Sequence, residues 1–208
     1  MGKCKTQILR VDPDGPDYAG HITRAGRLLR EGRLVAFPTE TVYGLAANAE
    51  REDALAALRA VKGRPEGKPF TFIICEQEEV ERRVGHVPPS VRALMGAFWP
   101  GPLTIVLPAG EAMIGFRMPD HRAALDLIRA AGVRLVAPSA NRSGGAEPGT
   151  AEDVMRELGG AIPLILDGGH VRLGRPSTVV RVSEDSCEVL RAGAIEEEEI
   201  RNVIKERS

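Results

Sequence analysis

The sequence predicts a single α/β domain built on a mixed β-sheet. Short apolar runs such as residues 34–37 and 133–137 are typical of buried strands, and they alternate with segments whose apolar residues recur at helical spacing. Several neighbouring strands are too close in sequence for a crossover helix, so the sheet should contain both parallel and antiparallel pairs. No stretch has the composition of a linker, and 208 residues suit one large domain.

Strands and helices are expected in alternation along the chain. Strands are predicted where apolar residues run together or alternate, at residues 6–11, 34–37, 71–75, 103–107, 114–119, 133–137, 163–167, 177–182 and 188–191. Helices are predicted where apolar residues recur every three or four positions, at residues 21–30, 53–61, 91–99, 123–131, 151–158 and 195–205. Gly32 and Gly132 directly follow two of these helices, as C-terminal caps do. The acidic residues 196–199 belong in the first turn of the last helix, where the helix dipole favours carboxylates.

Composition argues against several classes of protein. The net charge of −1 disfavours a protein that binds nucleic acid through bulk charge. The three cysteines, Cys4, Cys75 and Cys187, form neither a disulfide framework nor a zinc pattern, which predicts a reducing cytoplasmic location. The four histidines are scattered without ligand spacing, so no metal site is assigned to protein side chains. No apolar run is long enough to span a membrane, and no signal peptide is recognisable.

The most distinctive stretch is a basic loop. Residues 62–70 read KGRPEGKPF and place Lys62, Arg64 and Lys68 among two glycines and two prolines. Proline is poorly tolerated inside helices and central strands, so the segment is a loop, and its three cations suit a polyphosphate. A solvated basic turn is the plainer alternative. The segment is not a P-loop, because its glycine spacing is one residue short and Pro69 stands where a P-loop has Ser or Thr.

Small polar or cationic side chains follow the predicted strands. Thr39 follows the second strand, Ser139 and Asn141 follow the sixth, and Arg117 stands between apolar neighbours in the fifth. Ligands of open α/β sheets bind beyond the carboxyl ends of the strands, so these groups and the basic loop could line one concave surface. Each has a plainer alternative: a turn for Thr39, a capped strand end for Ser139 and Asn141, and an internal salt bridge for Arg117.

No conventional catalytic set is recognisable. The sequence has no GxSxG elbow, no Cys–His pair at a family spacing and no clustered acidic metal triad. Arginines, lysines, hydroxyls and an amide instead suit phosphoryl or nucleotidyl transfer, in which positioning and charge stabilisation supply most of the rate. Ser177 and Arg191 are further candidates, with backbone capping and a surface cation as their alternatives.

The sequence resembles the YrdC-like family. The matching segments are FPTETVYGL (37–45), KGRP (62–65) with Pro69, WPGPLT (99–104), RMP (117–119), PSAN (138–141), PSTVV (176–180) and RAG (191–193). They occur in order between about residues 11 and 191, and so many collinear motifs are specific. The chain therefore resembles the short form of the family, a single domain over residues 1–208 without the optional C-terminal extension.

The resemblance implies a fold and an activity. The expected fold is a twisted, mixed parallel and antiparallel sheet flanked by helices, with an open concave ligand cavity. The expected activity is that of an L-threonylcarbamoyladenylate synthase, which makes threonylcarbamoyl-AMP and pyrophosphate from L-threonine, bicarbonate and ATP with Mg²⁺. Threonylcarbamoyl transferase machinery, which modifies tRNA, is then expected as a transient partner in the cytoplasm.

By the same resemblance, the candidate side chains have roles. Those expected to hold threonine are Thr39, Arg117 and Ser177. Those expected to hold the nucleotide and its phosphates are Lys62, Arg64, Lys68, Ser139, Asn141 and Arg191. Among the latter, Lys62 and Arg64 are expected to be catalytic. The chain departs from the family pattern at Lys68, where Asn is frequent, and at residues 148–150, where Ser-Pro is usual.

Two rival functions are consistent with the sequence. The first is a module that binds double-stranded RNA or tRNA without nucleotidyl transfer, and salt-dependent RNA binding without pyrophosphate release would favour it. The second is the carbamoyl-adenylating activity of the YrdC-like segment of the hydrogenase maturation factor HypF, whose zinc-finger cysteine motifs are absent here. Comparing threonine with carbamoyl phosphate as substrate separates this rival from the synthase.

Overall fold

The computed structural model describes residues 4–65, 67, 69–183 and 186–205. The strands of this part are β1 (Gln7–Arg10), β2 (Val35–Phe37), β3 (Gly44–Asn48), β4 (Thr71–Ile73), β5 (Leu103–Ala109), β6 (Ala112–Arg117), β7 (Leu135–Val136), β8 (Leu164–Asp167), β9 (Thr178–Val182) and β10 (Cys187–Arg191). The helices are α1 (Tyr18–Arg30), α2 (Glu52–Lys62), α3 (Glu78–Val84), α4 (Pro89–Phe98), α5 (Arg122–Ala131), α6 (Ala151–Leu158) and α7 (Glu197–Lys205).

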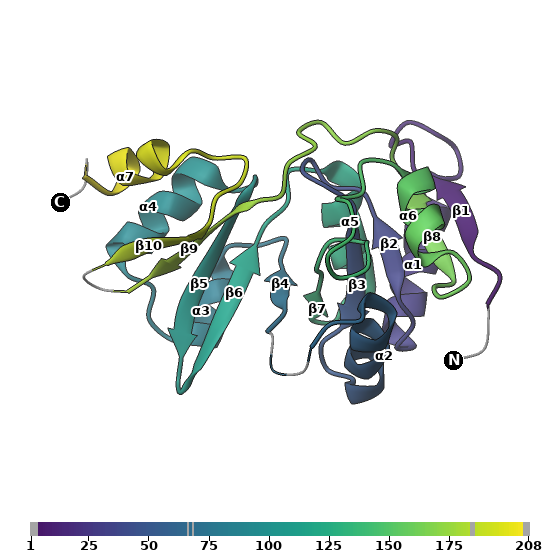
Figure 1. Cartoon of the computed structure of the whole chain (residues 1–208), viewed down its shortest axis with the longest axis horizontal. Helices are drawn as coiled ribbons and strands as arrows, with labels where there is room; N and C mark the ends of the chain where they lie inside the picture. The colour runs from purple at the N-terminus through teal and green to yellow at the C-terminus, as the bar shows by residue number, and fades with distance from the viewer. Residues whose placement is uncertain (1–3, 66, 68, 184–185, 206–208) are drawn as a thin grey trace.

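One mixed sheet runs along the molecule, and helices pack against it (Figure 1). The strand order is β1-β8-β2-β3-β7-β4-β6-β5-β9-β10. Four neighbouring pairs are parallel, β1 with β8, β2 with β8, β4 with β6, and β5 with β9. The other five are antiparallel. The predicted α/β class with a mixed, helix-flanked sheet is confirmed.

Every predicted strand and helix is present, and β3 and α3 are additional. The sequence of β3, GLAAN, lacks the β-branched and aromatic residues that mark strands. It forms a strand because it pairs with β2 on one side and with β7 on the other. Helix α3, EEVERRV, is two turns long and has two apolar residues, Val80 and Val84, which are too few to mark a helix in the sequence. The expected extent of the domain, 1–208 with a core at about 11–191, stays a prediction.

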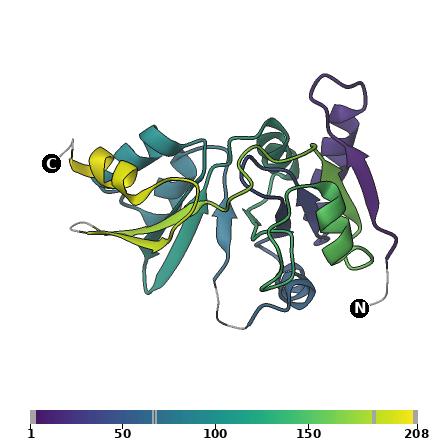
Figure 2. The ribbon, with the colours of Figure 1, turned by 45° about the horizontal axis from the view of Figure 1, so that its top comes forward.

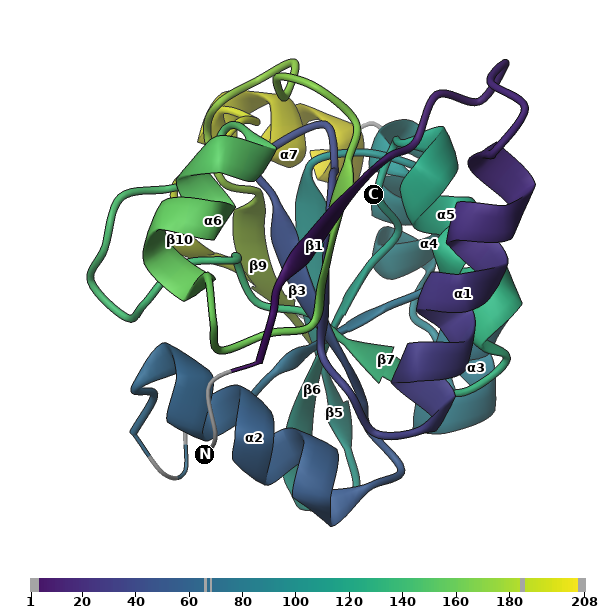
Figure 3. The ribbon, with the colours of Figure 1, turned by 90° about the vertical axis from the view of Figure 1, so that its right-hand side faces the viewer.

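In one half of the sheet, β8, β2 and β3 are covered on both faces, whereas the edge strand β1 is more exposed. Val35 and Phe37 pack in a cluster with α1 and α5, whereas Ala36 between them packs in a cluster with α2 and α6. The end-on view shows α1 and α5 on one side of these strands and α2 and α6 on the other (Figure 3). A strand buried on both faces reads as a continuous apolar run, which is why β2 is easily recognised.

The other half of the sheet has one apolar face. Leu103, Ile105 and Leu107 of β5 pack in one cluster with residues of α3, α4 and α7. Side chains alternate along a strand, so the residues between these point to the opposite face. That face carries Thr104 on β5 and Arg117 at the end of β6, and both side chains line a cleft rather than a hydrophobic cluster. In Figure 1, β5 and β6 lie in front of α3.

The two halves meet at β7. This strand is two residues long and pairs with β3 on one side and with β4 on the other. Beyond β7, the Ala137 amide still donates to Thr71 O, but the next bonds run to the other side, from Leu45 N to Pro138 O and from Ala140 N to Tyr43 O. The chain therefore follows β3 and leaves β4, and the sheet opens between them. Figure 2 shows β4, in blue, between the two groups of elements.

Three further observations concern membrane helices, disulfide bonds and metal sites. Among the described residues, no helix is both long and apolar enough to cross a bilayer. All three cysteines are free. The described residues also contain no group of three or more His, Cys, Asp or Glu side chains placed to hold a metal ion.

Close contact between α1 and α5 gives the first testable prediction. A Cβ on Gly26 would lie 2.7 Å from both the carbonyl carbon and the oxygen of Ala130 in α5, whereas a Cβ on Gly20 in the same helix would meet nothing within 4 Å. We expect Gly26→Ala to lower the free energy of unfolding by about 1–3 kcal/mol through overpacking. Gly20→Ala should raise it by up to about 1 kcal/mol through helix propensity. Urea unfolding measures both, and equal changes would contradict the close helix contact.

Candidate functional site

A cleft of about 790 Å³ lies where the sheet opens beside β7. Six of the nine predicted site residues line it, and they are Thr39, Arg64, Arg117, Ser139, Ser177 and Arg191. Phe70, Thr104 and Glu147 also contribute to the wall. The predicted open cavity is therefore present, and it brings together segments that are far apart in the sequence.

Thr39 lies in the tight turn between β2 and β3. Its Oγ1 donates to Val42 O at 2.6 Å, accepts from the amides of Thr41 and Val42, and lies 2.9 Å from Thr41 Oγ1. The turn role that the sequence suggests is thus present together with a place on the cleft wall. Because its hydroxyl contacts four polar atoms of Thr41 and Val42, Thr39 presents a rigid edge to the cleft.

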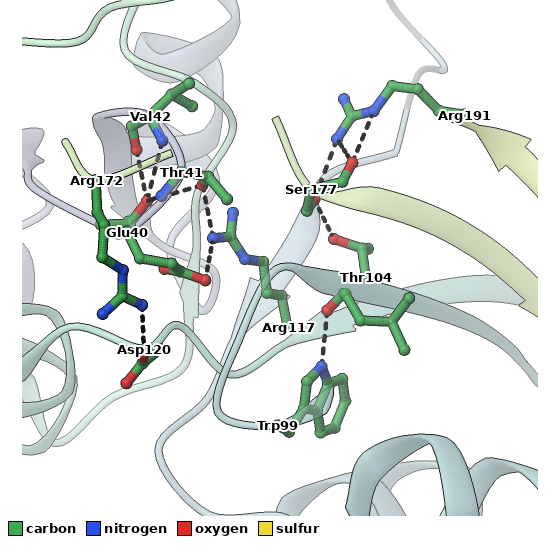
Figure 4. A network of polar contacts seen from close by, with 12 residues as sticks. Glu40, Thr41, Val42, Trp99, Thr104, Arg117, Asp120, Arg172, Ser177 and Arg191 are labelled. Carbon is green, nitrogen blue, oxygen red and sulfur yellow. Dashed lines mark hydrogen bonds and ion pairs between the residues drawn. The ribbon is translucent and has the colours of Figure 1, made fainter. Parts of the chain in front are cut away.

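Arg117 reaches the cleft from the end of β6. Its Nη2 donates to Thr41 Oγ1 at 2.6 Å and forms an ion pair with Glu40 Oε1 at 3.0 Å. The internal salt bridge that the sequence left open is therefore present. Figure 4 shows Arg117 between the Glu40–Thr41 turn and the group formed by Ser177, Thr104 and Arg191. The side chain is mostly buried but still lines the cleft.

Ser177 and Arg191 form the wall beside Thr104. Arg191 donates from Nη2 to Ser177 O at 2.8 Å and to Ser177 Oγ at 3.1 Å, and Ser177 Oγ lies 2.8 Å from Thr104 Oγ1. A register shift at the end of β10 accompanies Arg191, and such bulges re-aim side chains. Burial lowers the pKa of Arg191, and Glu147 opposes this shift. Gly193 is needed here, because a Cβ would overlap the backbone of Ser177 and Thr178.

Lys62 and Asn141 lie behind the wall rather than on it. The buried Lys62 Nζ donates to Ser139 O at 2.5 Å, to Asn141 O at 2.7 Å and to Asn141 Oδ1 at 3.3 Å. Ser139 Oγ in turn donates to Asn141 Oδ1 at 2.7 Å. Burial, with Arg64 nearby, lowers the pKa of Lys62 to about 8. The ammonium ties the end of α2 to the segment after β7.

The basic loop is described only in part. Arg64 lines the cleft, donates from Nη2 to Pro69 O at 2.8 Å and lies over the Phe70 ring at 5.0 Å. Arg59 lies over the same ring at 5.2 Å, so Phe70 is flanked by two guanidinium groups. Burial, then repulsion from Arg59, lowers the pKa of Arg64. Lys68 lies outside the described residues, so its predicted role stays a prediction.

Sequence reasoning missed several residues of this site. Thr104 had a usable signal, because it stands between the apolar Leu103 and Ile105 and must face the other side of the sheet. Glu147 is the one carboxylate residue among the described residues that line the cleft, and no pattern marks it. Tyr43 also lines the cleft, and its hydroxyl donates to Gly169 O at 2.8 Å, which fixes the turn after β2 against the end of β8.

The arrangement suits an elongated anionic ligand. Arg64, Arg117 and Arg191 bring three guanidinium groups to one cleft in a chain of net charge −1. Guanidinium groups bind carboxylates and phosphates through paired, charge-assisted hydrogen bonds. Hydroxyl groups of Thr39, Thr104 and Ser177 border the same space.

Comparisons with known proteins agree with this geometry. Residues 27–193 match the telomere recombination family, Sua5_yciO_yrdC. The chain is 44% identical over 213 residues to the threonylcarbamoyl-AMP synthase of Bacillus subtilis, covering 97% of this chain and 62% of that protein. It is similar to the crystal structure of P. abyssi Sua5 complexed with L-threonine, with a TM-score of 0.89 and 40% identity over 96% of this chain and 61% of that one.

The chain thus spans about three fifths of the length of these two proteins. Full-length HypF in its phosphate- and nucleotide-bound form has a TM-score of 0.71 at 21% identity, covering 83% of this chain and 29% of that one. This last likeness shows a shared fold alone.

The Lys62 contacts give a prediction about stability. Replacing Lys62 by Met keeps the aliphatic stem but leaves the buried carbonyls of Ser139 and Asn141 without their donor. An unsatisfied buried group costs about 1–3 kcal/mol, so we expect a loss of that size in the free energy of unfolding. Lys205→Met, at an exposed lysine of α7, is the matched control and should change little. If Lys62→Met lowers the free energy of unfolding no more than the control does, the hydrogen bonds of Nζ do not stabilise the fold.

The same lysine should make stability depend on pH. Its pKa is about 8 in the folded chain and 10.5 ordinarily, so between these values the unfolded chain binds more protons. The free energy of unfolding must then rise with pH through this group, starting near pH 8. We expect the urea midpoint of the wild type to increase more between pH 7.5 and 9.5 than that of Lys62→Met. Parallel changes in the two proteins would contradict a lowered lysine pKa.

Proposed function

This chain belongs to the Sua5, YciO and YrdC family, and from that premise we propose that it makes threonylcarbamoyl-AMP and pyrophosphate from L-threonine, bicarbonate and ATP. The observation that carries the proposal is the meeting of three arginines and several hydroxyl groups in one cleft. The name of the Bacillus subtilis relative and the L-threonine bound to P. abyssi Sua5 support it.

The threonine would occupy the side of the cleft bordered by Thr39, Arg117 and Ser177. Arg117 is the natural partner of its carboxylate, because a guanidinium group donates strong, charge-assisted hydrogen bonds to carboxylate oxygens. Thr39 and Ser177 would border the rest of the amino acid with hydroxyl groups held in place by their own hydrogen bonds. This assignment rests on the cleft geometry and on the family resemblance.

The nucleotide would occupy the side bordered by Arg64, Ser139 and Arg191, with Lys62 and Asn141 supporting the wall. The donor set fits a Mg²⁺ ion held mainly by phosphate oxygens and water, since Glu147 is the single acidic residue among the described residues of the wall. Magnesium sites of this kind use one or two carboxylates together with substrate phosphates. Bound there, the ion would neutralise phosphate charge.

The proposed chemistry needs no enzyme nucleophile. The threonine amine adds to bicarbonate, giving the carbamate and water. A carbamate oxygen then bonds to the α-phosphorus of ATP, the bond from that phosphorus to the bridging oxygen breaks, and pyrophosphate leaves with the electron pair. Arg64 and Arg191 would offset the charge on the departing group, which is how most phosphoryl-transfer sites gain rate.

We also propose that the product passes to a threonylcarbamoyl transferase that modifies tRNA in the cytoplasm. The adenylate is reactive, so transfer to a partner would have to be fast compared with hydrolysis. The charge of −1 gives no support to strong RNA binding through bulk charge, so we place RNA recognition with that partner.

Pyrophosphate release tests the proposal. The protein is incubated with ATP, Mg²⁺, bicarbonate and L-threonine, and the same assay is run with other amino acids and with carbamoyl phosphate. We expect release that requires threonine and bicarbonate together. For Arg64→Ala we expect at least about a 100-fold loss of kcat/KM, the size seen when a charge-stabilising donor is removed.

Arg33→Ala is the matched control, because Arg33 is exposed and lies outside the cleft. Full activity in Arg64→Ala would show that Arg64 of the basic loop takes no part in the reaction. RNA binding without threonine-dependent pyrophosphate release would favour the RNA-binding alternative instead.

A further inference from the structure

We propose that Glu40 is a positioning residue that orients Arg117 for the carboxylate of the amino acid. This inference deepens the proposed function and rests on it. Glu40 is not among the predicted site residues, yet it lies in the ion pair behind the cleft (Figure 4). Its carboxylate would act through Arg117 and not through contact with the substrate.

Glu40 is buried to an unusual degree for a carboxylate. Its side chain is 1% exposed, and among the described residues neither carboxylate oxygen accepts a hydrogen bond. The ion pair with Arg117, at 3.0 Å, is therefore its close charge compensation. Taking two charged groups out of water costs several kcal/mol for each, and their attraction often fails to repay this cost, so stability alone does not explain a buried pair of this kind.

The residues on the far side of Glu40 do not provide the positive charge that Arg117 provides. A second cavity of about 380 Å³ lies there, lined in part by Asp120, His121 and Arg172. Arg172 is engaged by Asp120 at 2.5 Å, and burial lowers the pKa of His121, which favours its neutral form. The positive charge that Glu40 meets directly is thus the guanidinium group that lines the threonine side of the cleft.

The contacts fix one edge of that guanidinium group. Nη2 of Arg117 is shared between Glu40 Oε1 and Thr41 Oγ1, while the buried Nε has no partner among the described residues. With Nη2 held from behind, the planar group cannot rotate freely. Nη1 has no polar partner among the described residues, so it is the donor left for a ligand. An arginine held in this way loses little entropy when it binds an anion.

Glu40 itself is held by the backbone. The Leu173 amide donates to Glu40 O at 2.8 Å, and the hydroxyl of Thr39 ties the following turn. The backbone at Glu40 is therefore fixed, and its side chain, 1% exposed, has little space in which to move away from Arg117. In the alternative, the ion pair between Glu40 and Arg117 competes with the substrate and must break before threonine binds. Removing the Glu40 carboxylate would then strengthen threonine binding, whereas our inference expects it to weaken.

The test separates threonine binding from ATP binding. Dissociation constants for L-threonine and for ATP with Mg²⁺ are measured by calorimetry on the wild type, Glu40→Gln and Glu50→Gln. Glu50 forms a surface pair with Arg134 at 2.8 Å and is the matched control. For Glu40→Gln we expect threonine binding to weaken at least about tenfold, which is 1.4 kcal/mol, while ATP binding changes less than about twofold.

A second variant guards against a folding defect. Thr41→Val keeps the shape of the side chain and removes the other oxygen that holds Nη2. It should weaken threonine binding about threefold to tenfold, which is the net size of one typical intramolecular hydrogen bond. Urea unfolding shows whether each variant is folded at the assay temperature.

The outcomes are distinct. Weaker threonine binding with unchanged ATP binding in Glu40→Gln supports the inference. Unchanged or tighter threonine binding in Glu40→Gln, with threonine bound by the wild type, overturns the inference and leaves the proposed function standing. If Glu40→Gln does not fold, unchanged threonine binding in Thr41→Val overturns the inference. If the wild type binds no threonine, the proposed function fails and the inference fails with it.

Discussion

The two residues of β7 are the constraint on which the site depends. Leu135 and Val136 pair with β3 and with β4 at once, so the whole sheet is continuous through this short strand. If β7 were longer, its backbone hydrogen bonds to β3 and β4 would continue and leave no space between the two halves of the sheet. Because the chain follows β3 after Ala137, the strand ends that carry polar side chains face a gap. The cleft is thus a product of strand length and pairing.

Each cation described around the gap is paired with an oxygen or an aromatic ring of the protein itself. Lys62 is held by carbonyls of the segment after β7, Arg117 by Glu40, and Arg191 by Ser177. Arg64 lies over Phe70. These contacts hold positive groups in place before a ligand arrives, which lowers the entropy lost on binding. They also explain how a chain of net charge −1 can present a strongly cationic hollow.

Much of the fold could be predicted from local patterns, whereas much of the site could not. Apolar runs located β2 and β8, and helical spacing located α5 and α6, because burial leaves a period in the sequence. β3 was missed because its small residues become a strand only through partners on both sides. Likewise, Arg117 and Glu40 stand 77 positions apart, and no local rule connects them. The resemblance selected segments that meet at the cleft, but it did not separate Lys62, behind the wall, from residues on it.

The alternation along β5 has a consequence for evolution. Leu103 and Ile105 contribute to the packed side of the strand, and Thr104 between them contributes to the cleft. Mutations at such an intervening position alter what the hollow accepts and leave the foundation of that half of the molecule intact. Proteins that descend from one ancestral gene can therefore change their ligands with little loss of folding free energy. Selection for binding and selection for folding act on alternate residues of the same strand.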